Sequence, residues 1–325
     1  MGLLMNLRFL AESACALLLS AAFLFAAAVS PERARAQGRQ NFDTVKVEIH
    51  PVQGKVYMLT GAGGNVTVQV GPDGVLLVDT QFAPMAPKIL AAIRELTDKP
   101  IRYIINTHVH GDHTGGNEAI AKSGQDVKIV GHENLLKVMS APPTHRPFDF
   151  SAPRGNWPTE TYKDQKTLEF NGEEVELIHS EQAHSSGDTI VFFRGSNVVS
   201  AGDVYANSRY PTFDPAGSIG GVIIGMNRIL GMITPPDKRG QGGTAIIPGH
   251  GPIAHQADLV AYRDMAVTLR DRIQTMLNQG MTLEQVKAKH PMKEYDPMYG
   301  GSATGIGSGD SAIEEIYDNL AGFDR

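Results

Sequence analysis

Three histidines and an aspartate lie within six residues of this chain, at His108, His110, Asp112 and His113. In an extended segment, side chains two residues apart point to the same side, so His108 and His110 can bind one cation together. Asp112 and His113 are adjacent and diverge, which suits them to a second ion. The spacing therefore predicts two metal ions about 3.5–4 Å apart, the arrangement of two-metal hydrolases.

Each ion needs further ligands, and three later residues are candidates. His184, Asp203 and His250 each lie just beyond a short apolar run with the character of a strand. The histidine-rich motif likewise follows a predicted buried strand at residues 101–105. Sites in α/β sheets lie at the carboxyl ends of strands. We therefore expect these four segments to meet at one edge of a sheet.

These residues, in this order, resemble the metallo-β-lactamase superfamily, and the resemblance extends from Asn65 to Pro252. It implies an α/β fold, the four-layer αββα sandwich in which two mixed β-sheets are flanked by helices. It also implies two zinc ions per chain. By this resemblance the first zinc would be bound by His108, His110 and His184, the second by Asp112, His113 and His250, and Asp203 would bridge the two.

One departure from the best-known members concerns the residue at position 203. Several antibiotic-degrading subclasses have a cysteine there, whereas the only cysteine of this chain is Cys15. A thiolate ligand is therefore excluded, and the second site must consist of nitrogen and oxygen donors. An aspartate at this position is similar to the glyoxalase II and lactonase-like branches of the superfamily.

The resemblance implies a metal-dependent hydrolase that opens cyclic amide or ester bonds of a small-molecule substrate, such as a β-lactam. Zinc would supply hydroxide to attack the carbonyl group, because ligand-bound Zn²⁺ lowers the pKa of its water to about 7. Alternatives are a lactonase, an esterase or another hydrolase of this fold without β-lactamase activity. His and carboxylate ligands also bind iron, so an iron-dependent redox enzyme is a further alternative. The last is a non-catalytic exported accessory protein that binds metal or assists the maturation of another periplasmic enzyme.

Other residues are assigned roles around the predicted metal centre. Asp112 is the expected proton shuttle, since one of its carboxylate oxygens would remain free of metal. Asp79, at the end of the predicted strand 75–78, is expected to hold the metal-binding loop, or else to be an ordinary turn residue. Tyr205, Arg209 and Tyr210 follow Asp203 and are candidates for substrate contact, with a solvated surface arginine as the alternative for Arg209.

The N-terminal segment has the features of a secretory signal peptide. An apolar stretch from Ala14 to Val29 is shorter than the ~20 residues that span a bilayer, and Ala34-Arg35-Ala36 predicts cleavage before Gln37. The expected organisation is a signal peptide at residues 1–36, with an uncleaved anchor as the alternative, followed by one domain at 37–325. We therefore expect a periplasmic or secreted protein without a stable membrane span.

Net charge argues against nucleic acid as a partner. The chain carries a formal charge of −6, and removal of residues 1–36 makes it −7. Binding to a phosphate backbone requires clustered Lys and Arg, so the nuclease branches are disfavoured.

Apolar periodicity and capping residues predict the helices. We expect helices at about residues 87–96, 218–233 and 258–278, a capping box from Thr282 to Gln285, and a C-terminal helix at 311–320. The helices predicted towards the C-terminus form a C-terminal helical extension of the domain.

Overall fold

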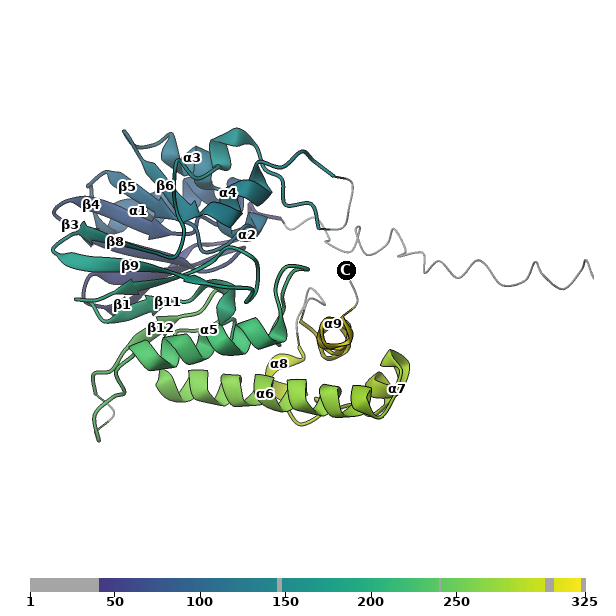
Figure 1. The fold of residues 1–325 in the computed structure, drawn as a ribbon. Coiled ribbons are helices and arrows are strands. Elements are labelled where there is room, and N and C mark those ends of the chain that lie inside the picture. The colour runs from purple at the N-terminus through teal and green to yellow at the C-terminus, as the bar shows by residue number, and fades with distance from the viewer. Residues whose placement is uncertain (1–40, 145–147, 240, 302–306, 323–325) are drawn as a thin grey trace, which may run out of the picture. The chain divides into compact units, whose positions relative to one another are not determined.

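The computed structural model describes residues 41–144, 148–239, 241–301 and 307–322 (Figure 1). Residues Asn41–Arg325 belong to one compact unit. The predicted signal peptide at residues 1–36 lies outside the described residues. In the described part of the chain, no helix combines the length and the apolar character needed to cross a membrane.

The first sheet has seven strands, which are adjacent in chain order. Its first four strands pair antiparallel and the remaining pairs are parallel, so the sheet is mixed. Two glycines, Gly71 and Gly74, close the tight turn between β3 and β4, and Gly74 has φ +135°, which favours glycine. The strands are β1 (Glu48–Gln53), β2 (Val56–Thr60), β3 (Val66–Gly71), β4 (Gly74–Val78), β5 (Ile101–Ile105), β6 (Lys128–His132) and β7 (Glu160–Tyr162).

The second sheet has five strands in the order β12-β11-β10-β9-β8. β11 and β12 are parallel and the other pairs are antiparallel, so this sheet is also mixed. Its strands are β8 (Gln165–Phe170), β9 (Glu173–Ser180), β10 (Asp188–Phe193), β11 (Val198–Ser200) and β12 (Ala245–Ile247). β10 is buried along its whole length, as its continuous apolar sequence requires of a strand covered on both faces.

Apolar side chains of the two sheets pack against each other and form the central core. Leu76 and Val78 of β4 belong to the same cluster as Leu177 of β9 and Phe193 of β10. Each sheet also has an apolar outer face covered by helices. The layers are therefore helix, sheet, sheet and helix, and the predicted αββα sandwich is confirmed (Figure 1).

The helices on the first sheet are α1 (Ala86–Leu96) and the short α3 (Asn117–Ala121). Their buried residues, including Ile89, Ile93 and Ile120, pack on the outer face of β3, β4 and β5. Two more short helices, α2 (Gly111–Thr114) and α4 (Glu133–Met139), follow β5 and β6. The predicted helix at 87–96 thus matches α1 within one residue.

The second sheet is covered by α5 (Ile219–Met232), α6 (Gln256–Asn278) and α9 (Gly309–Ala321), whose apolar residues share one core cluster with it. α6 begins two residues earlier than its apolar repeat predicts, because the Asp258 carboxylate accepts a hydrogen bond from the His255 backbone and caps the helix (2.9 Å). The predicted capping box from Thr282 to Gln285 is confirmed at the start of α7 (Leu283–Ala288). A short α8 (Asp296–Tyr299) precedes α9.

Candidate metal centre

Seven predicted ligands come together beyond the carboxyl ends of four strands. The histidine-rich motif follows β5, His184 follows β9, Asp203 lies in a 3-10 turn (Gly202–Val204) after β11, and His250 follows β12. Their donor atoms form two groups, each within 4.8 Å: His108, His110, His184 and Asp203 in the first group, and Asp112, His113 and His250 in the second. The sheet edge predicted from sequence therefore gathers two His/Asp clusters with the composition of a binuclear metal site.

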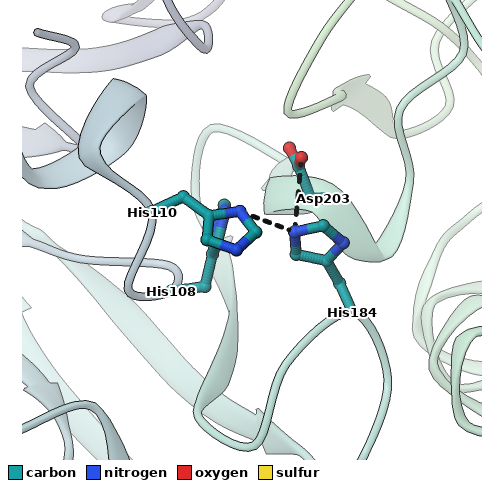
Figure 2. Close-up of side chains that lie close together, drawn as sticks. All are labelled: His108, His110, His184 and Asp203. Atoms are coloured by element: carbon teal, nitrogen blue, oxygen red, sulfur yellow. Dashed lines mark hydrogen bonds and ion pairs between the residues drawn. The ribbon is translucent and has the colours of Figure 1, made fainter. Parts of the chain in front are cut away.

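The first group consists of His108, His110, His184 and Asp203 (Figure 2), and hydrogen bonds to neighbouring residues fix the orientation of His108. The Thr107 hydroxyl donates to an Asp79 carboxylate oxygen (2.6 Å), so it accepts a hydrogen bond from His108 Nδ1 (2.9 Å). This leaves the lone pair on His108 Nε2. That atom is buried and has no hydrogen-bond partner among the described residues. Buried polar atoms are nearly always paired, so the position of Nε2 suits a metal ligand.

His184 is oriented in the same way. Its Nδ1 lies 2.6 Å from the Thr212 carbonyl oxygen and must donate to it, which leaves the lone pair on Nε2. His184 Nε2 lies 3.0 Å from His110 Nδ1 and 3.6 Å from Asp203 Oδ2 (Figure 2). Electron-rich atoms from three segments of the chain thus face one point, as ligands of a shared cation do.

In the second group, His113 Nδ1 donates to Asp79 Oδ2 (2.7 Å), so its Nε2 faces the site. This Nε2 lies 3.2 Å from His250 Nε2 and 3.7 Å from Asp112 Oδ2. The Asp112 side chain is 25 % exposed, whereas that of His113 is fully buried. The second group is therefore open to solvent on the side of Asp112.

Asp203 lies between the two groups. Its Oδ1 is 3.4 Å from His113 Nε2 and 3.6 Å from His250 Nε2, while Oδ2 faces His184. Within the described chain, Oδ1 is buried without a hydrogen-bond partner. One carboxylate thus presents oxygen atoms to both clusters, which is the placement that a bridging ligand needs. The donor set fits two ions that accept nitrogen and oxygen ligands.

Burial and the neighbouring charges shift the pKa values of these groups. Burial lowers the pKa of His108, of His184 and of His110, the last to about 3, so these imidazoles are neutral and able to bind metal at pH 7. Burial also opposes a charge on His113, but Asp112 and the other carboxylates outweigh it and raise the pKa of this histidine. The first cluster is therefore ready to bind a cation, whereas a metal in the second must displace a proton.

Asp79 supports the loop that carries the ligands. It has φ +65°, a left-handed conformation that aspartate tolerates better than most residues, and its carboxylate accepts hydrogen bonds from the Thr107 backbone (2.8 Å), the Thr107 hydroxyl and His113. One buried carboxylate thus orients a histidine from each cluster. These are the hydrogen bonds that a residue holding the metal-binding loop would make, and the role of Asp79 at a loaded centre stays a prediction.

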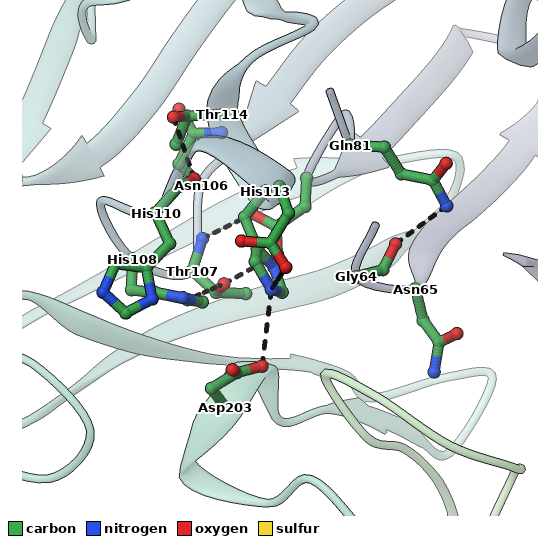
Figure 3. A network of polar contacts seen from close by, with 12 residues as sticks. Gly64, Asn65, Gln81, Asn106, Thr107, His108, His110, His113, Thr114 and Asp203 are labelled. Atoms are coloured by element: carbon green, nitrogen blue, oxygen red, sulfur yellow. Dashed lines mark hydrogen bonds and ion pairs between the residues drawn. The ribbon is translucent and has the colours of Figure 1, made fainter. Parts of the chain in front are cut away.

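Gly64, Asn65 and Gln81, which lie between β2 and α1, contact the second cluster and the loop that carries His250 (Figure 3). A Cβ atom on Gly64 would lie 2.2 Å from the His113 ring, so only glycine allows this close approach. The Gln81 amide donates to the Gly64 carbonyl (2.9 Å), and the Asn65 amide donates to the carbonyls of Pro248 and Gly251 on either side of His250 (both 2.9 Å). The first strands of the chain therefore hold the loop that carries the last ligand.

The three candidates for substrate contact have other positions than the sequence predicts. Tyr205 and Tyr210 are buried in the core, with 1 % and 0 % exposure, and the Tyr210 hydroxyl donates towards Asp296 Oδ1 (2.9 Å) and the Met292 carbonyl. Arg209 is largely buried and is not a solvated surface arginine. Its Nη2 donates to Asp203 Oδ2 (2.6 Å), and its side chain is 16 % exposed. The sequence alone does not indicate that folding pairs Arg209 with Asp203.

Phe150 lies beside the first cluster, although nothing in the sequence indicates this position. The Phe150 ring lies 4.7 Å from the His110 ring, and Phe148 lies 6.4 Å from Phe150 and is 45 % exposed. Trp157 belongs with Phe150 to a small apolar cluster around Val109, and its indole donates to the Ala152 carbonyl (2.7 Å). The first cluster therefore has an aromatic wall on one side.

Comparison with known proteins identifies the family. The sequence profile described as "Metallo-beta-lactamase superfamily" matches residues 59–261, more than half of the chain, so the chain belongs to this superfamily. The two His/Asp clusters are an intact metal-binding motif of this superfamily, many of whose members are metal-dependent hydrolases.

Two curated proteins and one solved structure illustrate the range of its relatives. The chain is 30 % identical over 146 residues to 2,4-dinitroanisole O-demethylase subunit alpha of Nocardioides sp. (strain JS1661), covering 44 % of this chain and 42 % of that protein. It is 25 % identical over 201 residues to a probable hydroxyacylglutathione hydrolase of Schizosaccharomyces pombe, covering 60 % and 67 %. A sec-alkylsulfatase structure from Pseudomonas sp. has a TM-score of 0.60 at 18 % identity, covering 85 % of this chain and 50 % of that one.

The extent of these matches separates two parts of the chain. The chain spans less than half the length of the O-demethylase subunit. The superfamily profile ends at residue 261, near the start of α6, so most of α6 and all of α7, α8 and α9 lie beyond it. The similarity to the alkylsulfatase covers a larger share of this chain than the profile does. We call residues 262–325 the C-terminal extension.

Proposed function

We propose that this protein is a binuclear zinc hydrolase of small-molecule amides or esters, with cyclic ones such as β-lactams and lactones as the favoured class. The observation that carries the proposal is the pair of His/Asp clusters with Asp203 between them. Nitrogen and oxygen donors without any thiolate suit zinc, with iron as the alternative. Similarity to a probable hydroxyacylglutathione hydrolase supports an acyl substrate.

In this proposal His108, His110 and His184 bind one zinc ion, Asp112, His113 and His250 bind the other, and Asp203 contacts both. Bound zinc supplies hydroxide at neutral pH, since it lowers the pKa of its water to about 7.

Asp112 is the residue placed to transfer a proton. Its carboxylate is the most exposed of the donor groups of the second cluster, and its Oδ2 lies 3.2 Å from His250 Nε2. Burial raises the pKa of this carboxyl, but the nearby imidazoles of His113 and His250 outweigh burial and lower it. Asp112 is therefore ionised at pH 7. An ionised carboxylate on the open side can accept the proton of an attacking water molecule and pass it to the leaving group.

Phe150 determines which substrates fit beside the first cluster. Its ring packs against His110 and presents an apolar surface next to the proposed point of attack. An aromatic or other apolar substituent on the substrate would bury area there and stabilise the complex. We therefore expect substrates in which an amide or ester carbonyl carries such a group nearby.

A substrate panel with a matched inactive variant tests the proposal. Zinc-loaded protein is assayed on a chromogenic cephalosporin, an aromatic lactone and an aryl ester, with and without a chelator and beside His110→Ala. The proposal predicts chelator-sensitive turnover of at least one substrate with kcat/KM above about 10⁴ M⁻¹s⁻¹, the lower end for enzymes on their own substrates. Two bound zinc ions without turnover of any amide or ester would contradict it.

A second candidate function is cleavage of an activated aryl methyl ether. Its support is the 30 % identity to an O-demethylase subunit, together with the aromatic side chain of Phe150 at the first cluster. The test is release of a coloured nitrophenolate from a nitrophenyl methyl ether in the same panel. Turnover of the ether alone would favour this candidate, and turnover of the amide or ester alone would exclude it.

Export of the protein is also a proposal, supported by the apolar stretch from Ala14 to Val29 and the cleavage pattern before Gln37. Determination of the N-terminus of the protein from cell fractions tests it. We expect a chain that begins at Gln37 in the periplasm or medium. A chain in the membrane that retains residues 1–36 would indicate the uncleaved anchor.

A further inference from the structure

A permanently charged side chain contacts the carboxylate that lies between the two clusters. Arg209 Nη2 donates to Asp203 Oδ2 over 2.6 Å, and the Asp203 side chain is only 1 % exposed. The other groups near Asp203 that can carry a positive charge are three imidazoles. His113 lies 3.4 Å away, and His184 and His250 lie 3.6 Å away. Arg209 therefore makes the shortest and strongest contact to this carboxylate.

The contact also determines how the two oxygen atoms of Asp203 are used. Arg209 binds Oδ2, while Oδ1 faces His113 and His250 and has no hydrogen bond among the described residues. Rotation of the carboxylate would break the short hydrogen bond to Arg209. Arg209 thus keeps Oδ1 directed at the second cluster before any metal binds.

Arg209 is in turn held by residues of the C-terminal extension. The Tyr262 hydroxyl, on α6, donates to the Arg209 backbone carbonyl (2.9 Å). The next residue, Tyr210, donates from its backbone N–H to the Gly307 carbonyl (3.3 Å), and its hydroxyl bonds to Asp296 of α8. The Arg209 side chain also packs closely over Gly307, where a Cβ atom would lie 3.1 Å from Arg209 Cδ.

We propose that Arg209 is a positioning residue of the metal centre and that the C-terminal extension sets its position. It neutralises the buried Asp203 carboxylate and fixes the orientation in which Asp203 contacts both ions. The extension, which lies beyond the region matched by the superfamily profile, would thereby influence metal binding through Tyr262 and Arg209. This inference rests on the proposed binuclear centre.

Zinc titration of the full chain tests the role of Arg209. Metal-free wild type, Arg209→Met and Arg209→Lys are titrated in competition with a chromophoric chelator, after circular dichroism has shown that each is folded. Loss of a residue that orients a ligand commonly weakens metal binding 10–100-fold. We expect two zinc ions in the wild type, one binding step weakened 10–100-fold in Arg209→Met, and partial recovery in Arg209→Lys, which retains a charge and a donor.

The outcomes separate this inference from the proposed function. A wild type that binds fewer than two zinc ions would contradict the binuclear centre, and with it the inference. A wild type that binds two, beside an Arg209→Met variant with unchanged affinities, would overturn the inference alone. Equal weakening in Arg209→Lys and Arg209→Met would also overturn it, because charge and hydrogen bonding would then have no part in the effect.

A pair of tyrosine variants tests the link to the C-terminal extension, and does so even if Arg209→Met does not fold. Tyr262→Phe removes the hydroxyl that binds the Arg209 carbonyl and keeps the ring. Tyr317→Phe is the matched control, since its hydroxyl donates to the Met281 carbonyl (3.0 Å) within the extension. We expect weaker zinc binding in Tyr262→Phe only. Equal affinities in the two variants would overturn the link.

Discussion

Substitution of Asp79 by asparagine should loosen the metal centre without removing any proposed ligand. The carboxylate accepts three hydrogen bonds, two from Thr107 and one from His113. An amide of the same size has one oxygen atom and an NH₂ group that cannot accept. Because asparagine also tolerates the backbone at φ +65°, the effect arises from the lost acceptor and charge and not from backbone strain.

The structure gives the size of this effect. The bond between His113 and an ionised acceptor contributes about 1.5–3 kcal/mol, and a buried donor left unpaired costs a further 1–3 kcal/mol. We therefore expect Asp79→Asn to lower the free energy of unfolding of the metal-free protein by about 3 kcal/mol. Less precise orientation of His108 and His113 should also weaken zinc binding about 10–100-fold, which corresponds to about 1.4–2.7 kcal/mol.

Chemical denaturation of the metal-free protein and chelator competition with zinc measure the two quantities. Asp73→Asn is the matched control, because Asp73 also accepts a backbone hydrogen bond, from Asn171 (2.7 Å), but in an exposed turn. We expect the control to bind zinc like the wild type. If Asp79→Asn bound both zinc ions with wild-type affinity, the argument that Asp79 orients His108 and His113 would be refuted.

Three further predictions concern the ligands, the substrate and pH. His110→Ala should lose zinc and hydrolysis together, as measured by metal content and turnover; lost metal with retained turnover would contradict the proposed chemistry. Phe150→Ala should raise KM for aromatic substrates about tenfold, from about 1.5 kcal/mol of lost ring contact, with unchanged zinc content; an unchanged KM would exclude the aromatic wall. The buried histidines have lowered pKa values, so their neutral forms stabilise the folded state above pH 6.5. Denaturation of the metal-free protein should therefore show stability falling below pH 6.5 towards pH 4, by about 1.4 kcal/mol per pH unit from His110 and by a further amount from His108 and His184, whereas the contribution of His113, with its raised pKa, is already complete there. A stability that is flat over this range would contradict the burial of neutral histidines.

The fold and the ligand set could be predicted because their signals are local. β5 and the motif that follows it are contiguous in the sequence. The common direction of the His108 and His110 side chains follows from their spacing alone and does not depend on distant residues. Apolar runs and glycine turns mark most strands, and the helix at 86–96 and the capping box at Thr282 follow from short patterns of residues. His184, Asp203 and His250 were candidates because each follows a strand-like run, and their assignment to particular ions came from the resemblance to a family.

The surroundings of the ligands could not be predicted, because they depend on long-range packing. Arg209 binds Asp203 only because Tyr262 and Gly307, more than 50 residues further along the chain, hold its backbone and side chain. Tyr210 follows Asp203 closely in sequence, yet its ring lies in the core, since the C-terminal extension supplies partners for its hydroxyl. Because Arg209 and Tyr210 follow Asp203 in the sequence, we predicted that they contact substrate. In the structure they instead bind to other residues of the protein.

The most direct test of the binuclear centre is a crystal structure of the protein grown with zinc, with anomalous diffraction recorded above and below the zinc absorption edge. Our account predicts two anomalous peaks, each about 2.0–2.2 Å from its histidine and carboxylate ligands, with Asp203 bound to both ions. A single peak, or two peaks that share no contact with Asp203, would contradict it.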